Sequence, residues 1–482
     1  MKCIAAILLA IALFISFVAC SGTSDTNTEI TTAAETEAVT ETDTEKEYPH
    51  YDNRDFNGKN YHILNCQKNQ WNMYTTIVAT ELVGEAVNDA VFERNARVIQ
   101  KLNLTMSEEN YTTNDSTFIN KLSTAILAGD DCYDIACVPM YQSTAGMIEG
   151  HYFNLDTLES IHLDKNWWNQ TMLAETSINN RHYLANSSVH LMFIDAIWCL
   201  YFNKDILKDI GMEQPYDLVR EGNWTYDAYQ KYLSAATMLN GDESFAWNSD
   251  GNCVYGVSSH GGMIDRYLFG MNAHFIEKDK NDQLVFTADS ELFTNVYQML
   301  ANSLSQPGVC LIANSEGFHY SKNIFINNRA AFIGAELKEG QVLRDMESEF
   351  GIIPYPKYNE EQPDYHSTVV RKASSIAIPI TQKIPEDAAL LLDALSFESE
   401  DVEKLFIEVR TEQKGLRDED SIEMLHIMLN TVGIDLGVGF YIIGNLWNSV
   451  LSAIPAGNTD ITSMVETYRG STLAEIEKLA EI

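Results

Sequence analysis

The sequence has none of the short motifs that mark common catalytic and phosphate-binding sites. Gly-x-Ser-x-Gly, His-Glu-x-x-His and Gly-x-x-x-x-Gly-Lys are all absent, which removes the usual signatures of serine hydrolases, zinc proteases and P-loop enzymes. Residues 256–260 lack the last glycine of the first motif, and Gly437-Val438-Gly439 lacks the third glycine of a dinucleotide-binding loop. Both segments are predicted to be turns. We therefore expect neither an enzyme nor a bound cofactor.

Metal-binding patterns are also missing. Histidines and cysteines are scattered along the chain without tight ligand spacing, so no metal centre is expected. Residues 239–252 hold Asp242, Asp250 and Asn252 among glycines, but the EF-hand spacing and its terminal glutamate are absent. An acidic turn is the interpretation we favour here, and a weak calcium site is left open.

Basic residues are scarce. The chain has 32 lysines and arginines against 69 aspartates and glutamates, which gives a net charge of −37 at neutral pH. Such a chain repels nucleic acid and anionic lipid headgroups. Nucleic acid is therefore excluded as an expected partner, and so is direct binding to a charged membrane surface.

An apolar run lies at the N-terminus. After Lys2, residues 4–18 are almost all apolar, and this run is shorter than the roughly 20 residues that a membrane-spanning helix needs. It is typical of an export signal. The tetrad Phe17-Val18-Ala19-Cys20 resembles the lipobox of bacterial lipoproteins, although that motif prefers leucine where this chain has Phe17. The resemblance implies cleavage before Cys20 and lipidation of that cysteine, and the alternative is an ordinary secretory signal.

A polar tract follows the signal. From Ser21 to about Glu47 the chain consists mainly of Ser, Thr, Glu, Asp and Ala, so it cannot bury enough apolar surface to offset the cost of ordering. We predict a disordered acidic tether over residues 21–50. With a lipid on Cys20, this tether would hold a folded domain at the outer face of the cytoplasmic membrane.

Six cysteines remain once Cys3 and Cys20 are assigned to the signal and the anchor: Cys66, Cys132, Cys137, Cys199, Cys253 and Cys310. No two of them have Cys-x-x-Cys spacing, and six cysteines allow fifteen pairings, so the sequence defines no disulfide framework. In an exported protein one or two bridges are compatible with the compartment. We predict that most are free, buried thiols.

Residues 51–482 alternate between strand and helix patterns. Strands are predicted at 61–65, 104–107, 133–138, 199–202, 254–258, 330–333, 350–354 and 376–379, and helices at 87–102, 118–127, 225–236, 292–304 and 386–395. Strand, helix, strand, helix, strand in the first part favours a parallel sheet covered by helices. Thr225 is expected to cap its helix, with Trp224 packed against the first turn. The chain is predicted to be an α/β protein of two domains.

The order of several local motifs is similar to that of extracellular solute-binding proteins of family 1, the carbohydrate receptors of bacterial ABC importers. The matching segments are Arg94-Asn95-Ala96, residues 128–131, Phe153-Asn154-Leu155, Tyr201-Phe202-Asn203-Lys204, residues 222–227, residues 350–357 and residues 374–379. This resemblance covers about residues 58–397. It implies a periplasmic-binding-protein-like type II fold, in which two α/β lobes close around a ligand cleft.

By the same resemblance, the first lobe would comprise residues 51–189 and 380–431, and the second lobe residues 196–372 and 432–482. Hinge segments would cross near 189–196 and 373–379. The implied function is that of a monomeric, lipid-anchored receptor that delivers a sugar or oligosaccharide to ABC permease subunits. Closure of the lobes around the ligand is the mechanism that this architecture supports.

A sugar site needs flat aromatic rings for C–H faces and polar groups for hydroxyls, at the carboxyl ends of strands. The candidate ligand-binding residues chosen in this way are Trp71, Tyr141, Gln142, Asp195, Trp247, His260, Asp265, Glu336, Tyr365 and Trp447, with Gln70, Asn72, His319 and Tyr320 as further polar or aromatic candidates. Trp71, Tyr141 and Asp195 are the first choices. Trp167, Trp168 and Trp198 are assigned to packing.

Two other classes of function remain open. A bilobed sensory lipoprotein would report ligand to a membrane kinase instead of feeding a transporter. An exported glycan-active enzyme would use the abundant carboxylates and aromatics, although no pair of carboxylates forms a recognisable catalytic setting in the sequence.

Overall fold

The computed structural model describes residues 54–482, except 67–72, 112–114, 313–317, 345 and 413–417. The described residues belong to one compact unit, residues 49–482. The export signal, Cys20, the tether, Gln70, Trp71 and Asn72 lie outside the described residues. Among the residues described, no helix is long and apolar enough to cross a membrane.

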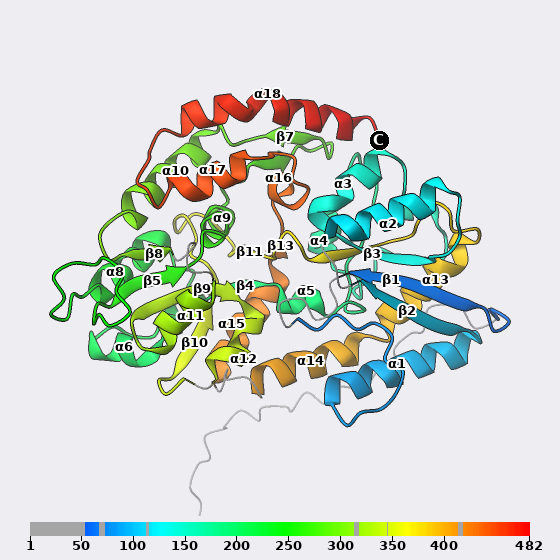
Figure 1. Ribbon diagram of the computed structural model, residues 1–482, viewed down its shortest axis with the longest axis horizontal. Helices are drawn as coiled ribbons and strands as arrows, with labels where there is room; N and C mark the ends of the chain where they lie inside the picture. The colour runs from blue at the N-terminus through cyan, green and yellow to red at the C-terminus, as the bar shows by residue number, and fades with distance from the viewer. Residues whose placement is uncertain (1–53, 67–72, 112–114, 313–317, 345, 413–417) are drawn as a thin grey trace, which may run out of the picture. The chain divides into compact units, whose positions relative to one another are not determined.

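The first sheet has four strands in the order β12-β3-β1-β2. Strand β1 (Asn60–Cys66) runs parallel to both β2 (Thr105–Tyr111) and β3 (Ile135–Pro139), as the alternating pattern predicts. Strand β12 (Ser374–Ala377) pairs with β3 in the antiparallel direction, because it enters this sheet from the other half of the unit. Helices α1 (Ala86–Leu102), α2 (Asp115–Leu127) and α3 (Met140–Ile148) follow the first three strands (Figure 1).

The second sheet has five strands in the order β10-β4-β9-β5-β8. They are β4 (Trp198–Asn203), β5 (Tyr255–Ser259), β8 (Cys310–Ile312), β9 (Ala330–Glu336) and β10 (Phe350–Ile353). Strand β5 is parallel to its two neighbours, whereas β4 is antiparallel to β9 and β10. The start of β4 therefore lies at the same edge as the ends of β5 and β9.

The remaining elements cover or connect the two sheets. They are α4 (Gln170–Thr176), α5 (Met192–Asp195), α6 (Lys204–Asp209), α7 (Tyr216–Arg220), α8 (Tyr226–Ala236), α9 (Met263–Gly270), α10 (Glu291–Leu304), α11 (Phe318–Ile326), α12 (Gly340–Leu343), α13 (Pro385–Phe397), α14 (Glu400–Glu412), α15 (Glu419–Asn430), α16 (Leu436–Gly439), α17 (Leu446–Ala453) and α18 (Ile461–Ala480), the strand pairs β6 (Ile276–Lys278) with β7 (Leu284–Phe286) and β11 (Ser367–Thr368) with β13 (Val432–Gly433), and short 3-10 turns at Leu155–Thr157 and Leu337–Glu339.

Local sequence explains where the helices begin and which face they bury. In α1 the Glu85 carboxylate accepts hydrogen bonds from the amides of Val87 and Asn88, and Val87, Val91 and Val98 are buried. In α8 the Thr225 hydroxyl caps the amide of Ala228, as expected, and the Trp224 side chain is fully buried. The Trp224 indole also donates to the carbonyl of Pro354, 3.0 Å away, so this residue ties the helix to the end of β10.

Two segments carry the chain between the sheets. Ala185 is bridged to Ile376 of β12 and Trp198 begins β4, so residues 186–197 pass from the first sheet to the second. Val369 is bridged to Ile197 and Ser374 begins β12, so residues 370–373 return. Their neighbours in space are the paired strands β11 and β13.

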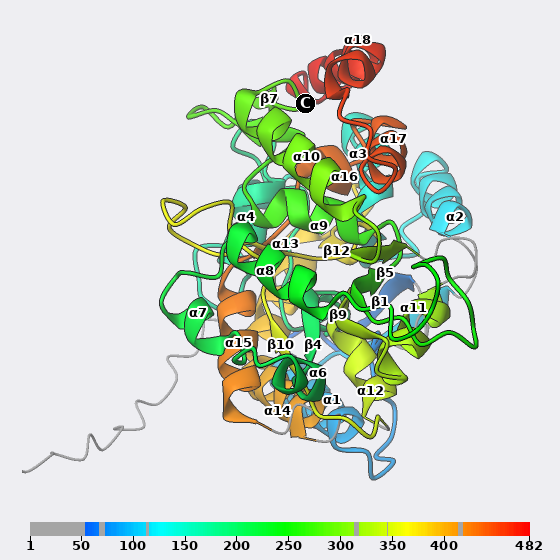
Figure 2. The same cartoon turned by 90° about the vertical axis from the view of Figure 1, so that its left-hand side faces the viewer.

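Helices α14 and α15 pack against different parts of the unit. Helix α14 packs on α1, whereas α15 lies beside β10 and α7 (Figures 1 and 2). Ser421 of α15 bonds the Tyr216 hydroxyl at 2.8 Å and accepts from the amide of Ile352 at 3.2 Å. Although α15 falls in the segment assigned to the first lobe from the sequence, its contacts are with the second sheet. The exact lobe boundaries stay predictions.

The described cysteines form no disulfide bonds, and the Asp242 carboxylate bonds within its own loop. Cys132, Cys137, Cys199, Cys253 and Cys310 are free thiols, and burial raises the pKa of Cys137 and of Cys199. The Asp242 carboxylate accepts from the amides of Asn252 at 2.6 Å and Cys253 at 2.9 Å, so it organises its own loop. No group of three or more potential metal ligands was found among the described residues.

Candidate functional site

Five of the sequence candidates meet at one edge where the two sheets face each other. Tyr141 lies just after β3, His260 follows β5, and Glu336 ends β9 opposite Trp198 of β4. Asp265 on α9 and Trp447 on α17 reach the same place from the second sheet's helices. Ligands of open α/β sheets bind at such carboxyl edges, so this is where a ligand site is expected.

Arg371 holds the aromatic residues of this edge together. Its guanidinium carbon lies 4.0 Å from the centre of the Trp447 ring, 5.1 Å from Tyr441 and 5.4 Å from Tyr141. The backbone carbonyl of Arg371 also accepts from the amide of Tyr141 at 3.1 Å. We name Tyr141, Arg371, Tyr441 and Trp447 the Arg371 cluster. Arg371 and Tyr441 are not among the sequence candidates, because their only sequence signal is closeness to the crossing segment and to a predicted turn.

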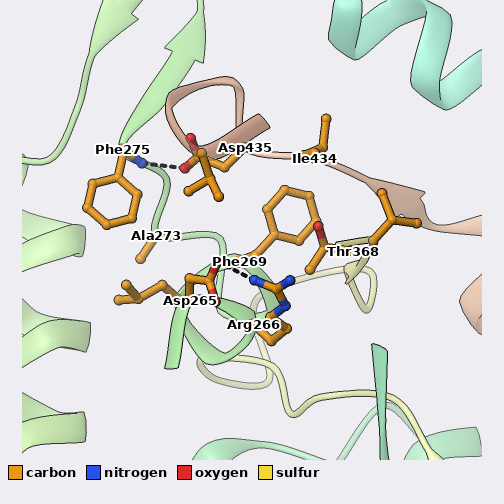
Figure 3. A pocket seen from close by; sticks show the side chains of 11 residues that line it. Asp265, Arg266, Phe269, Ala273, Phe275, Thr368, Ile434 and Asp435 are labelled. Carbon is orange, nitrogen blue, oxygen red and sulfur yellow. Dashed lines mark hydrogen bonds and ion pairs between the residues drawn. The ribbon is translucent and has the colours of Figure 1, made fainter. Parts of the chain in front are cut away.

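Asp265 and Arg266 continue the Arg371 cluster into the second sheet. The Trp447 indole donates to Asp265 Oδ2 at 2.9 Å, and the Asp265 carboxylate pairs with Arg266. Arg266 in turn lies 4.7 Å from the centre of the Trp198 ring. Trp198 is expected from the sequence to serve packing, and it also contacts this charged pair through Arg266. Figure 3 shows the two charged side chains of α9 joined to each other beside Phe269.

His260 is a neutral hydrogen-bond donor at this edge. Burial, with the charge of Arg266 in second place, lowers the pKa of His260 to about 4, so the ring is uncharged at neutral pH. Its Nδ1 accepts from the amide of Gly262 at 2.9 Å, which places the proton on Nε2. The ring meets Trp198 edge to face, with 5.2 Å between centroids. His260 is therefore an uncharged polar group at this edge.

Replacing Gly262 by alanine is expected to move the His260 ring without unfolding the chain. An added Cβ would lie 2.5 Å from Cε1 and 2.9 Å from Nδ1 of His260, while the Gly262 backbone is already helical. The His260 ring signals in an NMR spectrum should shift, with little change in melting temperature. Gly470→Ala is the control, since that position of α18 has open space. Unchanged His260 signals in G262A would show that the Gly262 contact does not orient the ring.

Several buried polar atoms at this edge have no hydrogen-bond partner among the described residues. They are Oδ1 of Asp265, Nε of Arg266, Oε2 of Glu336 and Nη1 of Arg371. The side chains of Asp265 and Glu336 are 5% and 8% exposed. Buried polar atoms are normally paired, and leaving one unpaired costs about 1–3 kcal/mol. Donors and acceptors are thus both available here for a polar ligand.

Asp195 ends α5, within the crossing segment 186–197. Its carboxylate is fully buried, accepts from the amide of Tyr74 at 2.9 Å and pairs with Arg410 of α14 at 2.6 Å. Burial raises the pKa of Asp195, and the Arg410 charge works against that rise. Asp195 therefore joins the crossing segment to α14, and its Oδ1 has no partner among the described residues.

The other candidates are spread over the unit. Gln142 follows Tyr141 in the first turn of α3. Trp247 stacks on Arg329 at 4.7 Å, in the loop before β5 and so at the opposite end of that strand from His260. The Tyr365 hydroxyl donates to the carbonyl of Val219 at 3.1 Å, deep beside Trp224. His319 and Tyr320 belong to α11, but their side chains lie outside the description.

A small cavity lies beside Asp265 and Arg266, next to the paired strands β11 and β13. It encloses about 10 Å³, about the space of one water, between Asp265, Thr368 and Asp435 (Figure 3). The Asp435 carboxylate accepts from the amides of Phe275 and Gly437 at 2.5 and 2.7 Å. Asp435 thus fixes the junction between β13 and α16.

Two carboxyl groups at this junction should make stability depend on pH. Burial raises the pKa of Asp435 to about 7 and that of Glu175, on α4, also to about 7. Both values exceed the roughly 4 of an unfolded chain, so each group stabilises the fold at low pH and that contribution is lost as pH rises through about 7. We expect Glu175→Gln to gain melting temperature relative to the parent chain as pH is raised from about 5 to about 7.5.

The comparison with the parent chain at each pH cancels the opposite effect of buried histidines. Burial lowers the pKa of His190 to about 4 and that of His274 to about 3. The stability that these two groups contribute to the fold is therefore lost as pH falls. Their contribution is common to both proteins. A constant difference between E175Q and the parent across this range would contradict the assignment.

The two sheets, the crossing segments and the edge just described define a periplasmic-binding-protein-like type II fold, as the sequence analysis expects. Among solved structures, the chain is similar to the galacto-N-biose/lacto-N-biose I-binding protein of an ABC transporter from Bifidobacterium longum, solved with lacto-N-biose. The TM-score is 0.57 at 13% identity, over 88% of this chain and 98% of that one. The fold class is therefore confirmed.

Two further structures show the same likeness. A family 1 extracellular solute-binding protein from Bifidobacterium longum subsp. infantis has a TM-score of 0.55 at 13% identity, over 88% of this chain and 100% of that one. An ABC substrate-binding protein from Listeria monocytogenes, solved with cycloalternan, has a TM-score of 0.54 at 14% identity, over 88% of this chain and 99% of that one. No family model and no curated protein matches this sequence.

Proposed function

We propose that this protein is an extracellular receptor that binds a sugar or oligosaccharide between its two sheets and delivers it to an ABC importer. The observation that carries the proposal is the Arg371 cluster with Asp265, since it combines aromatic rings, a guanidinium and a carboxylate at the carboxyl edge of both sheets. Aromatic faces suit the C–H faces of sugars, and charged groups make directional bonds to hydroxyls.

The similar proteins support this choice of ligand. Those from Bifidobacterium longum and Listeria monocytogenes were solved with lacto-N-biose and cycloalternan, and a maltose/maltodextrin-binding domain from Bdellovibrio bacteriovorus, with a TM-score of 0.52 at 13% identity, was solved with maltotriose. All are binding proteins, which favours a receptor over an enzyme. Closure of the sheets around the ligand would occur through residues 186–197 and 370–373.

A ligand screen tests the sugar proposal. Residues 49–482, the compact unit, are heated with mono- and oligosaccharides, and a sugar at about a hundred times its dissociation constant should add roughly 2.7 kcal/mol of stability. Peptides and polyamines serve as comparison ligands. A melting-temperature rise with those compounds and with no sugar would overturn the carbohydrate assignment.

The membrane attachment proposed for the receptor rests on the Phe17-Val18-Ala19-Cys20 tetrad. In cells that express the full chain, we expect the protein in the membrane fraction, and its Cys20→Ser variant in the medium or the soluble fraction. Mass spectrometry of the purified protein should find a lipid on Cys20. An unmodified N-terminus would remove the anchor and leave the receptor proposal standing.

A further inference from the structure

A second groove lies away from the Arg371 cluster, beside the segment that passes between the sheets. Its volume is about 310 Å³, and the residues that matter here are Trp167, Asn186, Ser188, His190, Glu403 and Asn430. We call it the Trp167 groove. It shares no lining residue with the Arg371 cluster, Asp265 or His260. Pockets that hold small ligands have volumes of about 300–1,000 Å³, so the groove suits a ligand the size of one sugar ring.

The groove is assembled from parts of the chain that are rigidly tied together. The Trp167 indole donates to Asp393 of α13 at 3.0 Å, and Trp168 is bridged to Ser187. The Asn186 side chain donates to the carbonyl of Ser374 at 3.2 Å and accepts from the Ser375 hydroxyl at 2.8 Å. The walls are therefore held by the first sheet and by the crossing segment, and not by mobile side chains alone.

His190 supplies a buried acceptor. The Asn65 amide group donates to the carbonyl of Thr75 at 2.6 Å, so its oxygen is the acceptor for His190 Nε2 at 3.2 Å. This leaves Nδ1 of His190 with a lone pair and no proton. The side chain is 3% exposed, and Nδ1 has no hydrogen-bond partner among the described residues. Burial also lowers the pKa of His190 to about 4, so the ring remains a neutral acceptor.

The charge of the lining selects against anions. No lysine or arginine lines the groove, and its one carboxylate, Glu403, accepts a hydrogen bond from the Ser188 hydroxyl. An anion would therefore meet no cation here. A half-buried indole, amides, hydroxyls and a neutral imidazole together suit a molecule with both an apolar face and hydroxyl donors.

We infer that the Trp167 groove is a second binding site, for a small uncharged polyhydroxylated molecule of the size of a monosaccharide or cyclitol. This site is separate from the cleft proposed for transport. The ring of the ligand packs against Trp167, and one of its hydroxyls donates to His190. Asn166 and Asn430, both exposed at the rim, are placed to bond the outer hydroxyls.

Fluorine NMR of the full chain labelled with fluorotryptophan tests the site directly. The chain has seven tryptophans, and the Trp167→Phe variant identifies the Trp167 signal. D-Glucose, D-galactose and myo-inositol are titrated to about 100 mM, which detects dissociation constants up to about 10 mM, near −2.7 kcal/mol. At least one of them should shift the Trp167 signal in a saturable way, and a hexose phosphate should not.

Two variants at exposed helix positions make the result specific. Asn430→Phe fills the rim of the groove and should weaken the Trp167 response at least tenfold, whereas Asn302→Phe on α10 should leave it unchanged. The response should also persist in Trp447→Ala, which disables the proposed transport cleft. No saturable shift of the Trp167 signal, or a shift that disappears in W447A and survives in N430F, would overturn the second site.

Discussion

Replacing Arg410 by methionine should lower the free energy of unfolding by about 3–5 kcal/mol. Arg410 is the charged partner of Asp195, and their side chains are 9% and 0% exposed. Without Arg410, the buried Asp195 carboxylate keeps only the hydrogen bond from the amide of Tyr74 and the charge of Lys338 to stabilise its ionised form. The contact also joins α14 to the crossing segment, so its loss should loosen both. Urea unfolding followed by circular dichroism measures the change.

Two controls separate the buried charge from the loss of a long side chain. In the double variant with Asp195→Asn no carboxylate remains to be stranded, so most of the lost stability should return. Arg469→Met breaks the exposed pair of Arg469 with Asp289, where both side chains are 38% exposed, and should cost at most about 1 kcal/mol. If R410M costs no more than R469M, the buried pair does not have the role assigned to it.

Replacing Trp447 by alanine should weaken binding of the sugar found in the ligand screen by about 10–100-fold, or roughly 1.4–2.8 kcal/mol. The change removes the ring that stacks on Arg371 at 4.0 Å and the indole N–H that bonds Asp265. Oδ2 of Asp265 then keeps only its bond from Arg266. Isothermal titration calorimetry measures the affinity.

Trp247→Ala is the matched control. Trp247 is also half-buried and also stacks on an arginine, Arg329, but it precedes β5 whereas His260 follows that strand. Its removal should leave sugar affinity within about twofold, well under 1 kcal/mol. Equal losses in W247A and W447A, or none in W447A, would place the sugar elsewhere. Because this test needs a bound sugar, it depends on the proposed function, whereas the R410M test does not.

The secondary structure was largely predictable because it depends on local pattern. The helix predicted at 87–102 is α1 (Ala86–Leu102), the strand at 199–202 is β4 (Trp198–Asn203), and the helix at 225–236 is α8 (Tyr226–Ala236). Apolar spacing and capping side chains act over a few residues, so they can be read from the sequence. The antiparallel pairing of β12 with β3 could not be predicted in this way, because it follows from where the crossing segment meets the first sheet.

The sequence predicted which types of residue form the site, but it did not predict which of these residues contact one another. Tyr141 and Tyr365 are both tyrosines near strand ends, yet one lies against Arg371 and the other donates to the carbonyl of Val219. Asp265 and Trp447 are 182 positions apart and meet only because α9 and α17 pack together. Arg371 was missed since neither an aromatic face nor a carboxylate marks it.

The sequence by itself determined the alternation of strands and helices, the acidic charge and the resemblance to solute-binding receptors, since these depend on composition and on neighbours along the chain. Only the tertiary structure decided which polar side chains meet. Arg371, Trp447 and Asp265 form one cluster, and Asp195 pairs with Arg410, because segments far apart in the chain cross between two sheets. Burial at those crossings then sets which charges are paired and which groups remain for a ligand.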